Sequence, residues 1–182
     1  TYQLSGLDDL NTANPKVREA LKDSYKYWIE KAGVDGYRID TAIYVEHDFL
    51  NDFIYGKGGV KESGKKAGKE IEVFGEAWFG GENSEDDIDI KTADYLGKGE
   101  KKELDRVLNF PMSSTIREVF CSSAPTKWLE KRVENVNKIY GGFNKTLNFI
   151  DNHDMERFCA IGNRVQLEQS LVCIMTLPGI PV

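Results

Sequence analysis

Three short apolar runs of this sequence each lead into a carboxylic acid, and these acids have the clearest potential for chemistry. They are Asp40, Glu76 and Asp154. If the runs are parallel strands, the residues at their carboxyl ends meet at one edge of the sheet, where such folds build active sites. Two carboxyl groups about 5–5.5 Å apart can cleave a glycosidic bond with retention, because one attacks the sugar while the other protonates the leaving oxygen.

The neighbours of Asp40 and Glu76 suit them to these two tasks. Arg38 precedes Asp40 by two positions, so both side chains leave a strand on the same side, and the guanidinium can keep the carboxylate ionised. Apolar surroundings raise the pKa of a carboxyl group and keep it protonated as a proton donor. Around Glu76 they are supplied by Phe74, Ala77, Trp78 and Phe79. Trp78 also offers a flat face on which a sugar can stack.

The first part of the chain predicts helices alternating with strands. A helix is expected from Pro15, with Asn14 as its cap, to Gly33, which can end it. A strand over 36–40 follows, then a second helix whose apolar side includes residues 49–54. A loop rich in glycine and lysine, over 56–69, leads to a strand over 71–76.

The second part continues the alternation after an acidic loop over 79–103 that has room for one short helix. A strand over 106–110 is stopped by Pro111, and Ser113 or Ser114 can cap a short helix through Phe120. The remaining expected elements are a helix over 126–140, a strand over 146–150, a helix over 165–176 and a strand over 177–182. Alternating strands and helices predict an α/β fold with a parallel sheet, either doubly wound or a (β/α)8 barrel. The sequence has no glycine-rich nucleotide-binding motif.

Three segments resemble signature regions of the α-amylase family of glycoside hydrolases (family thirteen). They are residues 36–42, 74–78 and 149–154, whose order and spacing resemble those of the family's fourth, fifth and seventh barrel strands. Residues 7–11, 110–112 and 177–181 resemble further motifs of the same family. The resemblance implies an α/β fold in which residues 1–182 form the C-terminal portion, about strands 4 to 8, of a (β/α)8 TIM barrel.

That partial catalytic domain would be truncated at both ends. The family's small inserted domain and its C-terminal β domain would lie outside residues 1–182. The start at Thr1 and the stop inside an apolar run also lead us to expect a piece of a longer protein.

The resemblance implies a role for each matching residue. Asp40 would be the nucleophile, Glu76 the acid/base, and Asp154 a third carboxylate that grips sugar hydroxyls and favours the distorted ring. Arg38 would hold Asp40 in place and His153 would bind the same sugar. The expected substrate-binding set is Arg38, Asn152, His153 and Trp78.

The implied activity is that of a retaining glycoside hydrolase acting on α-linked glucose oligo- or polysaccharides through a covalent glucosyl-enzyme intermediate. A transglycosylase using the same residues is the alternative, and a non-catalytic carbohydrate-binding relative is a third reading. No cofactor is expected for the chemistry and no metal ligand is assigned. Ile43 and Tyr44 stand where many α-amylases of the family have Lys-His, so these residues do not support the family's structural calcium site.

Composition and charge bear on the partners. The 182 residues carry a net charge of −6, which argues against nucleic acid and anionic membranes as partners and suits a neutral maltooligosaccharide or α-glucan. No apolar run is long enough to span a bilayer. The three cysteines, Cys121, Cys159 and Cys173, have no C-x-x-C spacing and predict neither zinc binding nor a disulfide framework.

Overall fold

The computed structural model of the protein describes residues 6–82 and 85–182, and its contacts divide them into two compact units. The first unit contains the described residues up to 76 together with 97–105. The second unit contains the described residues of 77–96 together with 106–182. Each unit pairs parallel strands with helices, so the expected α/β class with parallel strands is confirmed in both.

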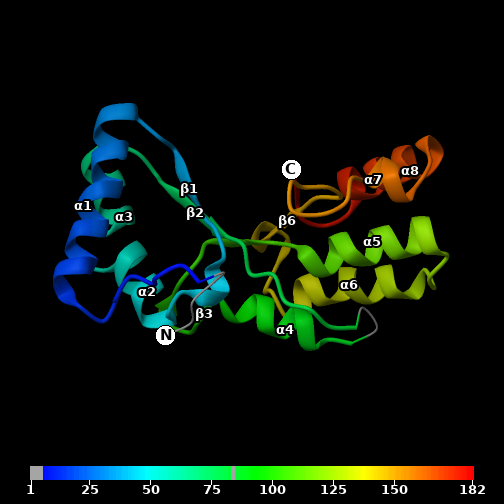
Figure 1. The fold of residues 1–182 in the computed structure, drawn as a ribbon, viewed down its shortest axis with the longest axis horizontal. Helices are drawn as coiled ribbons and strands as arrows, with labels where there is room; N and C mark the ends of the chain where they lie inside the picture. Colours follow the sequence, from blue (N-terminus) through cyan, green and yellow to red (C-terminus); the bar gives the residue numbers. More distant parts are fainter. Residues whose placement is uncertain (1–5, 83–84) are drawn as a thin grey trace. The chain divides into compact units, whose positions relative to one another are not determined.

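In the first unit three helices pack against one another beside two parallel strands (Figure 1). Strands β1 and β2 are in register from Gly36 opposite Glu72 to Ile39 opposite Gly75. The same unit contains β3 and β4, two strands of two residues each that pair in antiparallel orientation. In chain order its elements are α1 (Pro15–Ala32), β1 (Gly36–Ile39), the 3-10 turn η1 (Ala42–Tyr44), α2 (His47–Tyr55), α3 (Val60–Lys66), β2 (Glu72–Gly75), β3 (Gly97–Lys98) and β4 (Lys101–Lys102).

Helix α1 begins and ends where the sequence predicts. The Asn14 side chain accepts a hydrogen bond from the backbone N–H of Lys16 at 3.0 Å, and Pro15 occupies the first turn. Gly33 ends the helix at a φ of 65°, a left-handed conformation that glycine adopts without steric cost.

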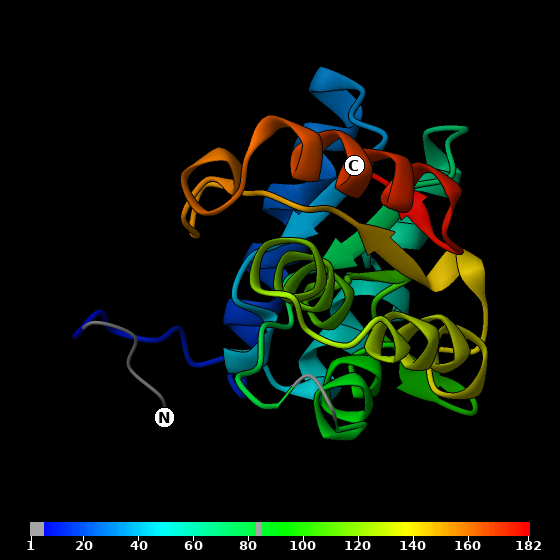
Figure 2. The same cartoon turned by 90° about the vertical axis from the view of Figure 1, so that its right-hand side faces the viewer.

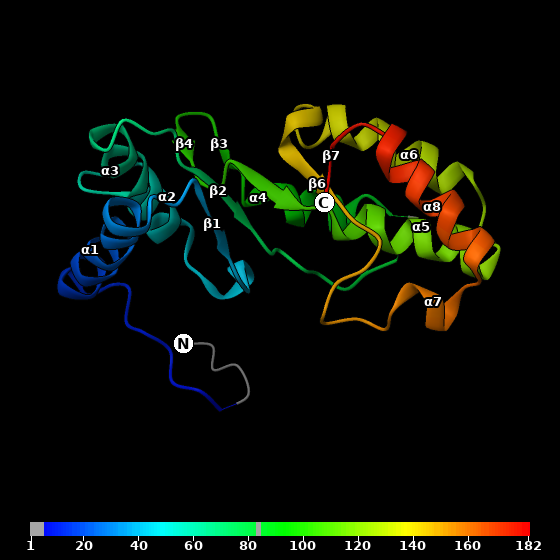
Figure 3. The same cartoon turned by 90° about the horizontal axis from the view of Figure 1, so that it is seen from above.

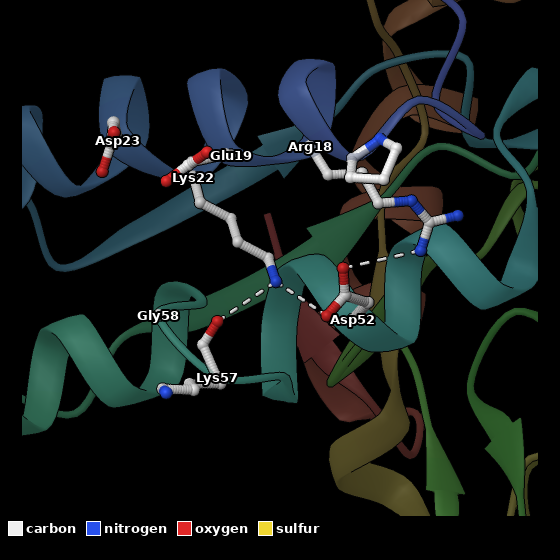
Figure 4. Close-up of a pocket in the computed structure, with 8 residues that line it drawn as sticks. Arg18, Glu19, Lys22, Asp23, Asp52, Lys57 and Gly58 are labelled. Atoms are coloured by element: carbon white, nitrogen blue, oxygen red, sulfur yellow. Dashed lines mark hydrogen bonds and ion pairs between the residues drawn. The ribbon is translucent and has the colours of Figure 1, made fainter.

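Charged side chains join α1 to α2 across a surface cavity of about 430 Å³ (Figure 4). Lys22 reaches from α1 to Asp52 on α2 at 2.7 Å and donates to the backbone oxygen of Lys57 at 3.2 Å. Arg18 contacts Asp48 at 2.6 Å and Asp52 at 3.5 Å. These opposite charges neutralise one another. The ion pairs therefore serve to join the two helices, and we assign the cavity no ligand.

The expected loop over 56–69 is wrong in part, because α3 occupies its middle. A Cβ on Gly64 of this helix would overlap the Cγ1 of Ile71, which is 1% exposed. Glycine therefore allows the helix to approach the residue that precedes β2. The glycines in and around α3 lower the helix propensity of this segment, and the packing that fixes the helix lies outside the segment itself.

The second unit places α5 between α6 and α8, as Figures 1 and 2 show, and α7 against α8. Strand β6 pairs in parallel with β5 and with β7. Figure 3 shows the same helices from above. In chain order the elements are α4 (Asp87–Asp94), β5 (Arg106–Leu108), α5 (Phe110–Ser122), α6 (Lys127–Lys138), the 3-10 turn η2 (Phe143–Lys145), β6 (Thr146–Asn148), α7 (Phe158–Ile161), α8 (Arg164–Thr176) and β7 (Ile180–Pro181).

The expected start of α5 is wrong. Pro111 does not separate a strand from a helix capped by Ser113 or Ser114; it lies in the first turn of α5. The cap is Asn109, whose side chain accepts from the N–H of Met112 at 3.1 Å. A proline is tolerated there because the first N–H groups of a helix have no intrahelical partner. The short helix α7 was not expected from the sequence.

Buried apolar residues of α5, α7 and α8, together with one residue that follows β6, form a core cluster in the second unit. The cluster consists of Met112, Ile116, Ile150, Phe158 and Ile174. Strand β6 is buried at all three positions, as expected for a strand covered on both faces. Strand β1 of the first unit differs, since all four of its residues are exposed or half-buried.

Candidate active site

One guanidinium nitrogen joins two of the three predicted carboxylates. Arg38 Nη2 donates to Asp40 Oδ1 at 2.9 Å and also to Glu76 Oε2. Arg38 lies near the end of β1, Asp40 directly follows that strand, and Glu76 directly follows β2. Parallel pairing of Arg38 with Phe74 and of Ile39 with Gly75 brings these ends level with each other.

Glu76 is the more enclosed of the two carboxyl groups. Its side chain is 8% exposed, whereas that of Asp40 is 69% exposed. Burial raises the pKa of Glu76 above its ordinary value, and the adjacent Asp40 raises it further, while Arg38 opposes the shift. The buried Glu76 is therefore shifted in the direction that a proton donor needs, and the neighbouring Asp40 is the accessible carboxyl group.

The turn after Asp40 has an unusual backbone. Thr41 adopts φ 43° and ψ 43°, a left-handed conformation that is rare for a β-branched residue. Ala42, which is fully buried, then donates its N–H to the carbonyl of Glu76 at 2.8 Å. Behind it, Gly75 has no room for a side chain, because a Cβ would overlap the Cδ1 of Leu104.

A cavity of about 310 Å³ lies beside Asp40 within the first unit. Its wall is largely apolar and combines residues of α1, α2 and β1. The lining residues are Leu21, Tyr25, Arg38, Ile39, Asp40, Val45, Phe49, Leu50 and Phe53. Asp40 and Arg38 therefore stand at the border between apolar surface and solvent.

Asn152, His153 and Asp154 lie in the second unit, in the run 149–157, which belongs to no helix or strand. His153 Nε2 is 3.1 Å from Asp154 Oδ2. The Asn152 side chain accepts from the N–H of Asp154 at 2.9 Å. The histidine side chain is 66% exposed and the aspartate side chain 39% exposed, so both are open to a ligand.

Trp78 also belongs to the second unit and is 41% exposed. Its ring stacks on that of Phe110, with centroids 4.8 Å apart and an interplanar angle of 13°. Phe110 is itself held edge-on by Phe149 at 4.9 Å. An exposed indole fixed from behind in this way is a ready platform for an apolar sugar face.

The predicted site residues thus form two groups, one in each unit. Arg38, Asp40 and Glu76 are in direct contact in the first unit. Asn152, His153, Asp154 and Trp78 are carried by the second unit, where His153 and Asp154 are in contact. The left-handed backbone of Thr41 was not predicted, because a threonine after a strand gives no signal for that conformation.

No three His, Cys, Asp or Glu side chains within residues 6–82 and 85–182 gather into a metal-binding cluster. In the same described ranges, no helix is both long and apolar enough to cross a membrane.

Comparison with known proteins gives relatives that are longer than this chain. Cyclomaltodextrin glucanotransferase from Thermoanaerobacterium thermosulfurigenes is 29% identical over 179 residues, which cover 98% of this chain and 23% of that protein. The enzyme of the same name from Bacillus sp. (strain 38-2) is 33% identical over 180 residues, with the same coverage. The chain therefore spans 23% of the length of these curated relatives.

Solved structures agree with this likeness. The crystal structure of CldA, described as the first cyclomaltodextrin glucanotransferase with a three-domain ABC distribution, matches with a TM-score of 0.81 and 30% identity. The match covers 99% of this chain and 34% of that one. An alpha-amylase from H. orenii shares the fold, with a TM-score of 0.73 at 24% identity over 98% of this chain and 35% of that one. The family model described as alpha amylase, catalytic domain, matches residues 1–182, and the chain therefore belongs to that family.

Proposed function

We propose that this chain carries the catalytic residues of an enzyme that cleaves α-linked glucose oligo- or polysaccharides with retention of configuration. One observation carries the proposal. A single nitrogen, Arg38 Nη2, contacts the carboxyl groups of both Asp40 and Glu76. The Asp40 side chain is exposed, whereas the Glu76 side chain is buried. Retaining glycosidases need such a pair, an accessible carboxylate beside a carboxyl group that holds its proton.

The separation of the two groups supports retention over inversion. Oxygens that accept from the same nitrogen lie within about 6 Å of each other, since each hydrogen bond is about 3 Å long. Retaining enzymes hold their carboxyl groups about 5–5.5 Å apart, whereas inverting enzymes hold them about 6.5–9.5 Å apart to admit a water molecule.

The proposed reaction has two steps. Asp40 attacks the anomeric carbon and forms a glucosyl ester, while the bond to the leaving oxygen breaks and that oxygen takes the proton of Glu76. Glu76, now ionised, then removes a proton from a water molecule, which attacks the anomeric carbon and releases Asp40. The product keeps the α configuration, and Glu76 ends the cycle protonated.

The second unit would supply the contacts that hold the sugar. Asp154 and His153 would bind its hydroxyl groups, Asn152 would orient the backbone of Asp154, and Trp78 would stack on a glucose unit. Every covalent step is assigned to a carboxyl group, so the proposed chemistry needs no metal or organic cofactor.

Transfer to a sugar acceptor is a second candidate outcome of the same chemistry. In that case a carbohydrate hydroxyl replaces water in the second step. The observation that favours it is the name of the curated relatives, which are cyclomaltodextrin glucanotransferases. A non-catalytic carbohydrate-binding role is disfavoured, because all three predicted carboxylates are present.

The test uses the full-length protein with maltooligosaccharides, starch and α-glucosyl fluoride. Asp40→Asn should lower kcat by about four orders of magnitude or more on all three, since no nucleophile remains. Glu76→Gln should lower kcat by about 10²- to 10⁴-fold on the natural substrates. On the fluoride, whose leaving group needs no protonation, the same variant should release fluoride in a rapid first step and then turn over slowly, because no general base remains for the second step.

Asp23→Asn on the exposed side of α1 is the matched control and should keep wild-type rates. Reducing ends and product lengths, followed together, separate hydrolysis from transfer. If Asp40→Asn keeps its turnover, or if the wild type acts on none of the three substrates, the proposed function is wrong.

A further inference from the structure

Arg117, in the middle of α5, spans the base of the loop that carries Asn152, His153 and Asp154. Its Nη1 donates to the backbone oxygen of Ile150 at 3.0 Å, and its Nη2 donates to the backbone oxygen of Glu156 at 2.6 Å. These two carbonyls lie just outside the three predicted sugar-binding residues, one on each side. One side chain therefore fixes both ends of the loop.

One of the two anchoring carbonyls, that of Ile150, belongs to the packed part of the second unit, whereas Glu156 is exposed. Ile150 is 6% exposed and Phe158 is 1% exposed, and both are in the core cluster. The guanidinium of Arg117 lies 5.9 Å from the centre of the Phe158 ring. Arg117 thus connects a helix, the core and both ends of the loop.

A second set of contacts fixes the same loop from its own residues. Asp151 Oδ2 accepts from the N–H of Phe158 at 3.1 Å, and Asp151 Oδ1 lies 3.6 Å from Arg157 Nη1. Between these contacts, Asp154 is bonded through its N–H to the Asn152 side chain and through its carboxylate to His153. The run 149–157 forms no helix or strand, so its shape depends on such side-chain bonds.

We infer that Arg117 is a positioning residue that holds the loop of Asp154 in its sugar-binding shape. The inference rests on the proposed function and adds a residue that does not touch the substrate. Two neutral carbonyls on one guanidinium suit arginine specifically, because its nitrogens form a rigid fork. A lysine has one nitrogen and cannot occupy both positions with the same geometry.

A purely structural role for Arg117 makes a different prediction. If the side chain only joined α5 to α7, its loss would lower the melting temperature and leave kcat unchanged well below that temperature. If it positions Asp154, its loss should lower kcat more than it raises KM, because Asp154 is proposed to favour the distorted ring of the transition state.

The first measurement is amide hydrogen exchange in the full-length protein, as wild type, Arg117→Met, Arg117→Lys and the control Arg164→Met. Arg164 is an exposed arginine of α8 that pairs with Glu168. In Arg117→Met we expect faster exchange in residues 151–157 and unchanged exchange in α6. Unchanged exchange in 151–157 overturns the inference, whatever the activity of the protein.

The second measurement is kinetics on maltooligosaccharides at least about 15 °C below each melting temperature. We expect kcat to fall about 10- to 100-fold in Arg117→Met, as for a catalytic group displaced by about 1 Å. The loss should be partial in Arg117→Lys and absent in Arg164→Met. Millimolar guanidinium chloride should restore kcat in Arg117→Ala, while equal sodium chloride should not.

The outcomes separate this inference from the proposed function. A wild type without activity overturns the proposed function, and with it the inferred effect of Arg117 on turnover. An active wild type with unchanged kcat in Arg117→Met overturns the positioning role alone. Faster loop exchange, lower kcat and rescue by guanidinium together support it.

Discussion

The backbone N–H of Ala42 donates a hydrogen bond of 2.8 Å to the carbonyl oxygen of Glu76. One step earlier, the N–H of Glu76 donates to the carbonyl of Ile39 at 2.9 Å. The parallel ladder therefore continues past the ends of β1 and β2, and it passes directly beside Asp40 and through Glu76. Because the backbone of Glu76 is bonded to Ile39 and Ala42 on either side of Asp40, the carboxyl groups can meet on Arg38 without relying on a flexible loop.

Thr41 allows this connection by its left-handed backbone, at φ 43°. Such a conformation costs a non-glycine residue about 1–2 kcal/mol. In Thr41→Gly the relief of this cost is offset by the greater freedom of glycine in the unfolded chain. We expect the free energy of unfolding to change by less than about 1 kcal/mol, while kcat falls because the turn after Asp40 is looser.

Thr41→Asn is the matched control, since asparagine tolerates the left-handed region better than threonine does. It should keep both stability and kcat. Urea denaturation and steady-state kinetics on one preparation measure the two quantities. Equal kcat values for the Gly and Asn variants would show that the rigidity of this turn has no effect on turnover.

Gly75 is required by close packing behind the same turn. In Gly75→Ala the added methyl group would overlap Leu104 Cδ1 and lie 3.3 Å from the Cβ of Ala42, and both neighbours are buried. We expect a loss of about 1–3 kcal/mol in the free energy of unfolding, as for other overpacked sites. Activity should fall as well, since Glu76 is the next residue.

Gly80→Ala provides the control, because a Cβ at Gly80 meets nothing within 4 Å. Its unfolding free energy should stay within about 0.5 kcal/mol of the wild type. Chemical denaturation of both variants measures the two changes in the free energy of unfolding. If the two substitutions cost the same, the close contact with Leu104 does not limit this position.

Local signals in the sequence were sufficient for part of this fold. The start and end of α1 follow from Asn14, Pro15 and Gly33, each of which acts on the backbone next to it. The start of α5 could not be predicted as reliably, because Pro111 is equally compatible with stopping a strand and with the first turn of a helix. Helix α3 depends on the contact between Gly64 and Ile71, which a local pattern does not contain.

The candidate site shows the same division. Spacing by two residues predicted that Arg38 would reach Asp40, and the parallel-strand argument predicted that Glu76 would join them. Nothing in the sequence near residue 117 predicts a bond to Ile150 or Glu156, because those contacts arise from helix packing. The placement of the chain as about strands 4 to 8 of a barrel stays a prediction.

The raised pKa of Glu76 gives stability a pH dependence of defined sign. Burial and Asp40 raise the pKa of this carboxyl above its ordinary value, so the folded state holds the proton more tightly than the unfolded chain does. The stabilisation is fully present below the unfolded pKa and is lost as pH rises through the folded pKa. Glu76→Gln, which does not ionise, should therefore gain stability relative to wild type as pH rises through that window.

Denaturant titrations across this pH range measure the difference between the two proteins. Glu19→Gln, at an exposed position of α1, is the control and should show no such relative gain. The same titration also bears on catalysis, because kcat should fall as pH rises past the pKa of the proton donor. A relative stability of Glu76→Gln that is flat or falls with pH would contradict the assigned direction.

The buried ion pair between Arg132 and Asp89 offers a test of how the second unit is held together. Both side chains are 1% exposed, and Asp89 also accepts from Asn135 at 2.7 Å and from Tyr140 at 2.8 Å. Removing one partner leaves a buried charge uncompensated, so Arg132→Met and Asp89→Asn should each cost about 3–5 kcal/mol of unfolding free energy. The double variant should cost less than the sum of the two, because it leaves neither charge behind.

A double-mutant cycle by urea denaturation measures this coupling. The control is the exposed pair of Lys138 with Glu134 on the same helix, at 2.6 Å, whose removal should cause no measurable loss because solvent screens it. Additive losses for Arg132 and Asp89 would mean that the two charges do not stabilise each other. In that case the hydrogen bonds of Asn135 and Tyr140 would be the contacts that hold α4 to α6.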